Sequence, residues 1–133
     1  MANRRGCAVR VSVCMMVKNE ERNLRRCLDS VRQLTDELIV VDTGSTDATV
    51  AIAKEYGASV LHSPWRNDFS FHRNESMAQA TGDWVLIIDA DEQLVIEDGR
   101  DIRAQLSVIG EACDATRMWV EDLQGGVVTM RHQ

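Results

Sequence analysis

The chain has 133 residues, of which 44% are hydrophobic and 27% charged, a composition typical of one soluble globular domain with its own core. The formal net charge of −6 argues against nonspecific binding to nucleic acid or to an anionic membrane surface. No apolar run approaches the roughly 20 residues that span a bilayer, so no transmembrane segment is expected.

The cysteines and the N-terminus predict a cytoplasmic protein. The four cysteines lack Cys-x-x-Cys spacing and are too few for a disulfide scaffold, so they are expected to be reduced and mostly buried. They are Cys7, Cys14, Cys27 and Cys113. The N-terminal "MANRRGCAVR" is basic, but the apolar stretch after it breaks at Lys18, so no signal peptide is expected.

Strands and helices alternate along the chain. A β-branched, apolar strand is predicted at 8–17, followed by a helix at 19–31 with acids in its first turn. The next strand, 36–42, leads into a helix at 43–57 that has a choice of capping side chains and stops at Gly57. The expected inward residues are Leu24, Cys27, Leu28 and Val31 in the first helix, and Val50, Ala53 and Tyr56 in the second.

The second half continues this alternation and then changes. A third strand at 58–63 ends at Pro64, a helix is expected from Ser70 to Ala80, and a fourth strand covers 83–89. After Glu97 a helix through Ile102, Leu106 and Ile109 is predicted. Two strands, 115–123 and 127–131, flank a Gly125-Gly126 pair that suits a hairpin turn.

This order predicts an α/β fold with a mostly parallel sheet and helices on both faces. In such sheets ligands bind at the carboxyl ends of the strands. The polar residues of this sequence gather there: Lys18, Asn19 and Glu20 after the first strand, Asp42, Thr43, Gly44 and Ser45 after the second, and Asp89, Asp91 and Glu92 after the fourth.

The carboxylates after the fourth strand point to a metal ion. Two carboxylates about 4 Å apart repel by about 4 kcal/mol at an effective dielectric of 20, and a divalent cation turns that repulsion into attraction. Carboxylate oxygens are what Mg²⁺ or Mn²⁺ prefers, with phosphate and water completing the shell. The chain has no Walker or Rossmann glycine loop, so a phosphate ligand would need such a cation.

Three segments carry a resemblance to a known family. "VSVCMMVKNEERNLRRCLDSV", "ELIVVDTGSTDATVAIAKEYGASV" and "WRNDFSFHRNESMAQATGDWVLIIDADE" resemble successive motifs of family 2 glycosyltransferases of the GT-A fold. The nearest likeness is to a bacterial branch in which "DFSxxRN" precedes "ATGDW" and "DADE". The likeness covers about residues 10–94.

The resemblance implies a nucleotide-diphospho-sugar donor, expected to be a UDP-sugar, a divalent Mg²⁺ or Mn²⁺, and inverting transfer to an acceptor that the sequence does not identify. It implies that Asp42 reads the nucleobase, that Arg73 approaches base and phosphate, and that Asp89 faces the ribose and metal shell. Asp91 would ligate the metal. The donor would lie against the three strand ends, at Val17, Lys18, Asn19 and Glu20, at Gly44 and Ser45, and at Asp89, Ala90 and Asp91.

The family places its general base, an Asp or Glu, well beyond the Asp-x-Asp motif, in the acceptor-binding half. This sequence ends at Gln133, so residues 1–133 are expected to form a donor-binding portion of one GT-A domain that lacks that half. The acidic pair Glu121-Asp122 is the alternative for the base, although it precedes a hairpin turn and has no matching context.

Plainer interpretations stay open for several residues. Asp42 could cap the following loop, and Arg73 could be an ordinary surface arginine. "GSTDAT" is a helix start whatever else it does. The scattered histidines have no zinc spacing, and the tryptophans are expected in the core or cleft wall, with Trp65 the one placed to touch the donor.

Two other classes of protein also remain open. Nucleotidyltransferases that make sugar nucleotides share a parallel sheet and a metal-binding acid, but they usually carry a basic, glycine-rich loop where this chain has "MMVKNEERN". A noncatalytic module that binds a nucleotide without transferring a sugar is the other alternative.

Overall fold

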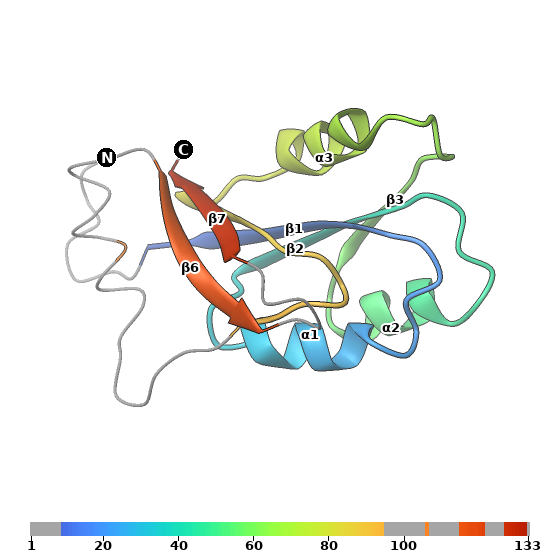
Figure 1. The fold of residues 1–133 in the computed structure, drawn as a ribbon, viewed down its shortest axis with the longest axis horizontal. Helices are drawn as coiled ribbons and strands as arrows, with labels where there is room; N and C mark the ends of the chain where they lie inside the picture. Colours follow the sequence, from blue (N-terminus) through green and yellow to red (C-terminus); the bar gives the residue numbers. More distant parts are fainter. Residues whose placement is uncertain (1–8, 95–105, 107–114, 122–126, 133) are drawn as a thin grey trace.

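A computed structural model describes residues 9–94, 106, 115–121 and 127–132 (Figure 1). In chain order the elements are β1 (Val11–Val17), α1 (Leu24–Val31), β2 (Glu37–Asp42), α2 (Thr49–Glu55), β3 (Ser59–His62), α3 (Phe69–Ala78), β4 (Trp84–Ile87), β5 (Gln93–Leu94), β6 (Ala115–Glu121) and β7 (Val127–His132). No helix in these ranges is both long and apolar enough to cross a membrane.

The strands form one sheet in the order β3-β2-β1-β4-β7-β6-β5. Strands β1 to β4 pair in parallel, and Val17, Asp42 and His62 stand level with one another at the carboxyl ends of β1, β2 and β3. The chain builds outward from β1 to β3 and then returns to place β4 on the other side of β1. The strand order therefore reverses between β1 and β4, which is where open α/β sheets bind ligands.

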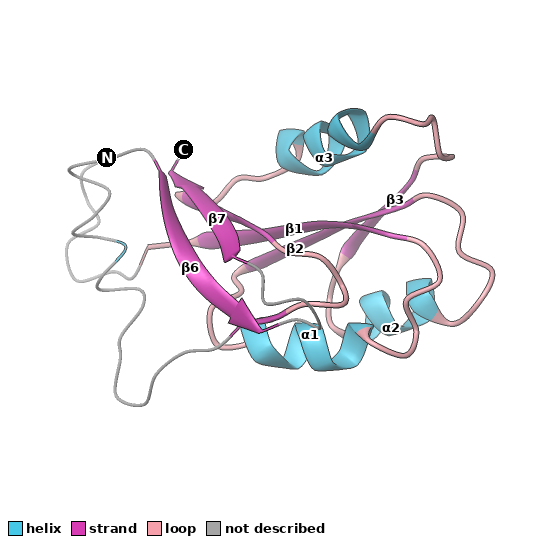
Figure 2. Ribbon diagram, viewed as in Figure 1, coloured by secondary structure: helices cyan, strands magenta, loops and turns pink. Residues whose placement is uncertain are grey.

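Helices cover both faces of the sheet (Figure 2). Helices α1 and α2 lie on one face, where Leu24, Leu28 and Ile52 join the main core against alternate β1 residues such as Val13. Helix α3 lies on the opposite face, over a smaller core around Cys14, Ile39 and Val85. The expected α/β fold, with a mostly parallel sheet between helix layers, is confirmed.

The first two helices begin later than predicted. The expected inward residues of α1 (Leu24, Cys27, Leu28 and Val31) are all buried, as predicted. The helix starts at Leu24 rather than residue 19, because Asn19 adopts a positive φ of 54° and Glu20 closes a turn by accepting from the N–H of Leu24. The acids therefore precede the helix, and the prediction that they occupy its first turn was wrong.

Helix α2 starts at Thr49, after a loop that occupies residues 43–48. Ala53 is buried as predicted, and Tyr56 packs partly buried against the core. Val50 is only half-buried, so its predicted inward position was wrong, and Ile52 is buried in its place. The buried face therefore includes Ala53 and Tyr56 as predicted, together with Thr49 and Ile52 in place of Val50.

The C-terminal strands extend the sheet in antiparallel fashion. β6 pairs with β7, as predicted from the Gly-Gly pair, and β7 pairs with β4. β5 pairs with β6 and was not predicted, since a strand of two residues shows no periodicity. Most of the helix predicted after Glu97 lies outside the described residues, and only Leu106 is seen there, helical and buried.

A hydrogen-bonded cluster closes the end of the sheet where β1 and β4 begin. The Ser12 hydroxyl donates to Glu37 Oε1 at 2.6 Å and accepts from the Gly82 N–H at 2.9 Å. The Thr81 N–H also donates to Glu37 Oε1, at 2.8 Å. Burial acts to raise the pKa of Glu37, but the hydrogen bonds from Ser12 and Thr81 outweigh it and hold that pKa below its ordinary value.

Candidate functional site

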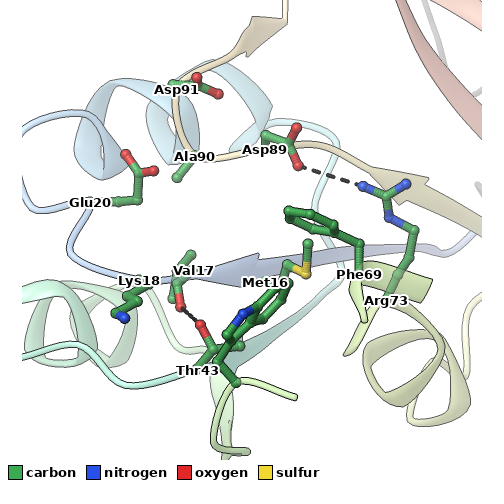
Figure 3. A pocket seen from close by; sticks show the side chains of 11 residues that line it. Met16, Val17, Lys18, Glu20, Thr43, Phe69, Arg73, Asp89, Ala90 and Asp91 are labelled. Atoms are coloured by element: carbon green, nitrogen blue, oxygen red, sulfur yellow. Dashed lines mark hydrogen bonds and ion pairs between the residues drawn. The ribbon is translucent and has the colours of Figure 1, made fainter. Parts of the chain in front are cut away.

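A cavity of about 450 Å³ opens where the strand order reverses, at the carboxyl ends of β1 and β4 (Figure 3). Val17, Lys18 and Glu20 line it from the end of β1 and the loop that follows. Asp89, Ala90 and Asp91 line it from the loop after β4. Two segments about 70 residues apart in sequence thus meet at one site, as the topology of a parallel sheet dictates.

The remaining wall comes from α3 and the loop before it. Phe69 and Arg73 lie one helical turn apart on α3, and Trp65 precedes that helix. Asp68 caps α3 by accepting from the Phe71 N–H at 3.1 Å, which fixes where the helix begins and so how these side chains face the cavity. Trp65 and Phe69 are 38% and 65% exposed, and among the described residues they are the large hydrophobic side chains most open to solvent.

The three carboxylates after β4 do not form one cluster. Glu92 turns back, and its Oε1 accepts from the Asp89 backbone N–H at 2.8 Å. Asp89 Oδ1 lies 3.9 Å from Arg73 Nη2, while Asp91 lies apart from this pair, beyond Ala90 (Figure 3). Arg73 and the backbone therefore offset part of the repulsion that the sequence pattern indicated.

A metal ion would have to be held jointly by protein and ligand here. Within the described ranges no three His, Cys, Asp or Glu side chains stand together as a ready-made metal cage. Asp89 and Asp91 both line the cavity, and one or two carboxylates are what Mg²⁺ usually takes from a protein when phosphate oxygens and water complete its shell. The donor set and the room in the cavity thus fit a hard divalent cation.

The loops after β1 and β2 are bonded to each other. The Asn19 N–H donates to Ser45 Oγ at 2.9 Å, and the Thr46 N–H donates to Asn19 Oδ1 at 2.7 Å. Asn19 reaches both partners because of its left-handed backbone, which asparagine tolerates better than most residues. Asn19, Gly44 and Ser45 therefore lie in the loops beside the cavity and do not line it.

Asp42 is 5% exposed at the end of β2. Its two carboxylate oxygens lie 3.2 and 3.3 Å from the Ser45 backbone nitrogen, whose N–H they accept. Its Oδ2 is also 3.7 Å from His62 Nδ1. The local loop bonding offered as an alternative for Asp42 is thus present, and its role in reading a base stays a prediction.

Most of the predicted donor-binding residues line the cavity, namely Val17, Lys18, Glu20, Arg73, Asp89, Ala90 and Asp91. Thr43, which was expected at this edge of the sheet but not named as a donor contact, also lines it, and so do Met16 and Phe69, which were not predicted. Phe69 could have been found from its place in "DFSFHRN" beside Arg73, one turn away. Met16 gave no such signal, because a strand residue of this kind could equally face the core.

The thiols near the site are buried. Cys27 Sγ lies 3.4 Å from the Asp89 carbonyl oxygen, and burial, followed by the charges of Glu92, Asp89 and Asp91, raises the pKa of Cys27 to about 12. Burial likewise raises the pKa of Cys14 to about 12. Both cysteines are free, as expected of reduced thiols.

The family of the chain follows from its sequence profile. Residues 12–111 match the sequence profile described as Glycosyl transferase family 2, which covers most of the chain. The chain belongs to this family, and the resemblance seen in its motifs is confirmed.

Curated relatives share much of this sequence, and one of the two that follow is named a glycosyltransferase. A TPR repeat-containing protein of Synechococcus elongatus is 55% identical over 96 residues, which are 72% of this chain and 24% of that protein. An uncharacterized glycosyltransferase of Rickettsia typhi is 45% identical over 85 residues, 64% of this chain and 29% of the relative. The chain thus spans only about a quarter of the length of these relatives.

Solved structures share the fold. The TarS 1–349 crystal structure from S. aureus superposes with a TM-score of 0.65 and 27% identity, over 80% of this chain and 34% of that one. Glucosyl-3-phosphoglycerate synthase from Mycobacterium tuberculosis, in a complex with Mn²⁺, UDP and glucosyl-3-phosphoglycerate, gives a TM-score of 0.54 and 34% identity over 67% of this chain and 35% of the synthase.

Proposed function

We propose that residues 1–133 form the donor-binding portion of an inverting glycosyltransferase that uses a UDP-sugar and Mg²⁺ or Mn²⁺. The observation that carries the proposal is the cavity at the strand-order reversal, with Asp89 and Asp91 on one wall and Arg73 on another. The similar mycobacterial synthase was solved with Mn²⁺ and UDP, which supports the same ligand chemistry here.

The charges of the cavity wall fit this ligand. Glu20, Asp89 and Asp91 bring negative charge, and Lys18 and Arg73 bring positive charge. A diphosphate would meet repulsion from the carboxylates unless a cation lay between them, and a bound divalent ion would supply charge stabilisation to the leaving diphosphate. In the proposal Asp91 and Asp89 hold that ion with the diphosphate, and Arg73 donates to phosphate oxygens.

The proposal assigns no general base. The side chain of Glu121 and the whole of Asp122 lie outside the described residues, so neither carboxylate is placed against the cavity. The acceptor is likewise unassigned, and a base elsewhere in the acceptor-binding half stays the expectation. The cytoplasmic location belongs to the same proposal and is supported by the free thiols of Cys14 and Cys27.

Calorimetric titration of UDP, with Mn²⁺ or with chelator, tests donor binding. We expect binding that requires Mn²⁺, and a loss of at least tenfold in affinity in Asp91→Asn. Asp29→Asn removes an exposed carboxylate that does not line the cavity and serves as the matched control. Equal UDP affinity with and without chelator would remove the metal from the proposal.

A second assay separates the alternative classes. Radiolabelled UDP-sugars with a crude acceptor extract report sugar transfer or slow donor hydrolysis, whereas a nucleotidyltransferase would release pyrophosphate from UTP and a sugar phosphate. Family membership favours the first outcome. Tight UDP binding with neither reaction would indicate a noncatalytic module.

A further inference from the structure

His72 is fully buried on α3 and holds the loop that precedes this helix. Its Nε2 lies 3.1 Å from the backbone nitrogen of Arg66. Its Nδ1 lies 2.9 Å from Glu75 Oε1 and 3.3 Å from Ser63 Oγ. One side chain thus joins both ends of the 63–66 segment to the helix.

The partners of His72 fix the form of its ring. A backbone N–H can only donate, so Nε2 accepts from Arg66 and carries no hydrogen. The ring hydrogen therefore sits on Nδ1 and is donated to the Glu75 carboxylate. The hydrogen bond from Ser63, opposed by burial and assisted by His72, lowers the pKa of Glu75 below its ordinary value, so this acceptor stays ionised.

Trp65 is held against this ring. The indole stacks on His72 with centroids 5.2 Å apart and planes 23° apart, and Phe69 meets it edge-on at 4.8 Å. Its Nε1–H donates to Asn67 Oδ1 at 2.9 Å. The indole still lines the cavity, so a partly exposed aromatic surface is fixed there from three sides.

We propose that His72 is a positioning residue that fixes Trp65 as a stacking wall for the nucleobase of the donor. The inference rests on the proposed function, because it assumes a nucleotide in this cavity. No part of the family resemblance assigns a role to His72 or Trp65, and the histidines carried no ligand spacing in the sequence.

The polarity of the cavity decides which part of the ligand meets Trp65. Asp89 and Asp91 belong to the loop after β4, and they suit the diphosphate and its cation. Trp65, Met16 and Thr43 bring no charge to the lining. A flat, uncharged ring is the group of a nucleotide that gains from such a wall, because every base offers a face for aromatic stacking.

Calorimetric titrations of the full chain with UDP and with pyrophosphate, each in the presence of Mn²⁺, test whether the nucleobase stacks on Trp65. We expect Trp65→Ala to weaken UDP about 5- to 100-fold and to leave pyrophosphate unchanged, because only UDP carries a base. His72→Phe should do the same, since phenylalanine keeps a ring but cannot accept from Arg66. Phe71→Ala is the matched control, as Phe71 touches His72 without lining the cavity.

A conservative variant separates positioning from general packing. His72→Gln places an amide oxygen where Nε2 accepts from Arg66, so it should recover much of the UDP affinity that His72→Phe loses. Amide hydrogen exchange of Arg66, followed by NMR without ligand, should be slow in the wild type, fast in His72→Phe and slowed again in His72→Gln. Circular dichroism confirms that each variant compared is folded.

The outcomes distinguish the two proposals. A folded His72→Phe with unchanged UDP affinity, or with UDP and pyrophosphate weakened equally, overturns the positioning role. Fast Arg66 exchange in the wild type overturns it without reference to any nucleotide. A wild-type chain that binds neither probe, with slow Arg66 exchange, overturns the proposed function and the nucleobase contact while leaving the hold of His72 on the loop supported.

Discussion

Arg73 Nη2 on α3 faces Asp89 Oδ1 in the loop after β4, across a gap of 3.9 Å. The two side chains are 44% and 54% exposed, and ion pairs this open to water contribute about 0–1 kcal/mol to stability. The pair therefore does little for folding. It places a guanidinium and a carboxylate at the mouth of the same cavity, at a separation that leaves Arg73 able to turn toward a phosphate.

Replacing Arg73 should affect ligand binding far more than stability. In Arg73→Gln we expect UDP affinity to fall about 10- to 100-fold, the value of a charge-assisted hydrogen bond of about 1.5–3 kcal/mol. The free energy of unfolding should change by less than about 1 kcal/mol. Arg25→Gln removes the same charge from an exposed pair with Glu55 and should leave UDP affinity unchanged. An equal loss of UDP affinity in both variants would show that the loss comes from the change in net charge and not from a contact of Arg73 with the ligand.

Asp42→Asn tests base reading without removing the loop contact. The amide oxygen of asparagine can still accept from the Ser45 N–H, so the fold should persist. The new NH₂ group opposes the N–H of uracil but suits the ring nitrogen acceptor of cytosine. We expect UDP affinity to fall about tenfold while CDP affinity holds or rises. Calorimetry with both nucleotides measures the ratio, and an unchanged ratio would make Asp42 a loop-capping residue only.

The sequence predicted the sheet because buried parallel strands leave a strong signal. Val13 and Val40 lie in uninterrupted apolar runs, and both runs are strands. The helix starts were predicted poorly, because they depend on contacts between loops. Asn19 stops α1 from starting early by bonding to Ser45 and Thr46, which lie beyond β2. A scan of local propensity cannot detect partners so distant in the chain.

The residues that line the cavity were predicted where they follow a strand directly, because the position of the strand places them. Residues that directly follow strands, such as Lys18 and Asp89, were placed correctly at the carboxyl edge because the topology alone brings them there. The hold of His72 on Trp65 was not predicted. A single histidine within a helix has no periodic partner, and its neighbours Ser63 and Arg66 belong to a loop whose course the sequence did not define.

Cys14 and Cys27 should resist alkylation in the folded protein. Burial raises the pKa of each thiol from 9.0 to about 12, so almost no thiolate is present at pH 8. In a Cys7→Ser, Cys113→Ser background we expect iodoacetamide labelling only after denaturant is added. Mass spectrometry measures it, and rapid labelling of the native chain would show that the thiols are open to solvent.

The same shift predicts lower stability at high pH. The folded state binds the thiol protons more tightly than the unfolded state, so this contribution is complete below pH 9 and is lost as the pH rises toward about 12. Urea unfolding at several pH values between 8 and 11 measures the decline.

Gly82→Ala should destabilise the chain by about 1–3 kcal/mol through overpacking. A Cβ at this position would lie 2.7 Å from Ser12 Oγ and 2.9 Å from the carbonyl oxygen of Arg10. Gly57→Asn is the comparison, because nothing lies within 4 Å of a Cβ there, and its loss should come only from the backbone strain of a φ of +82°, which asparagine tolerates better than most residues. Adding Ser12→Gly should not restore Gly82→Ala, since the Arg10 carbonyl still blocks the methyl group. Urea titration of the wild type and these three variants gives the free energies of unfolding.

The hydrogen bonds of Asn19 with Ser45 and Thr46 join the loop after β1 to the loop after β2, so the two loops are expected to move together. Neither loop can move outward alone without breaking a hydrogen bond between a backbone N–H and a side-chain oxygen of the other loop, so much of the entropy of arranging this edge is lost during folding rather than during binding. A ligand that docks against Lys18 and Thr43 would then meet a surface already in place. Asn19→Ala would remove the bond from the Thr46 N–H to Asn19 Oδ1 but keep the backbone N–H that donates to Ser45, so the loops would be held less tightly. The cost would appear as a slower, more entropy-opposed association rather than as a missing contact.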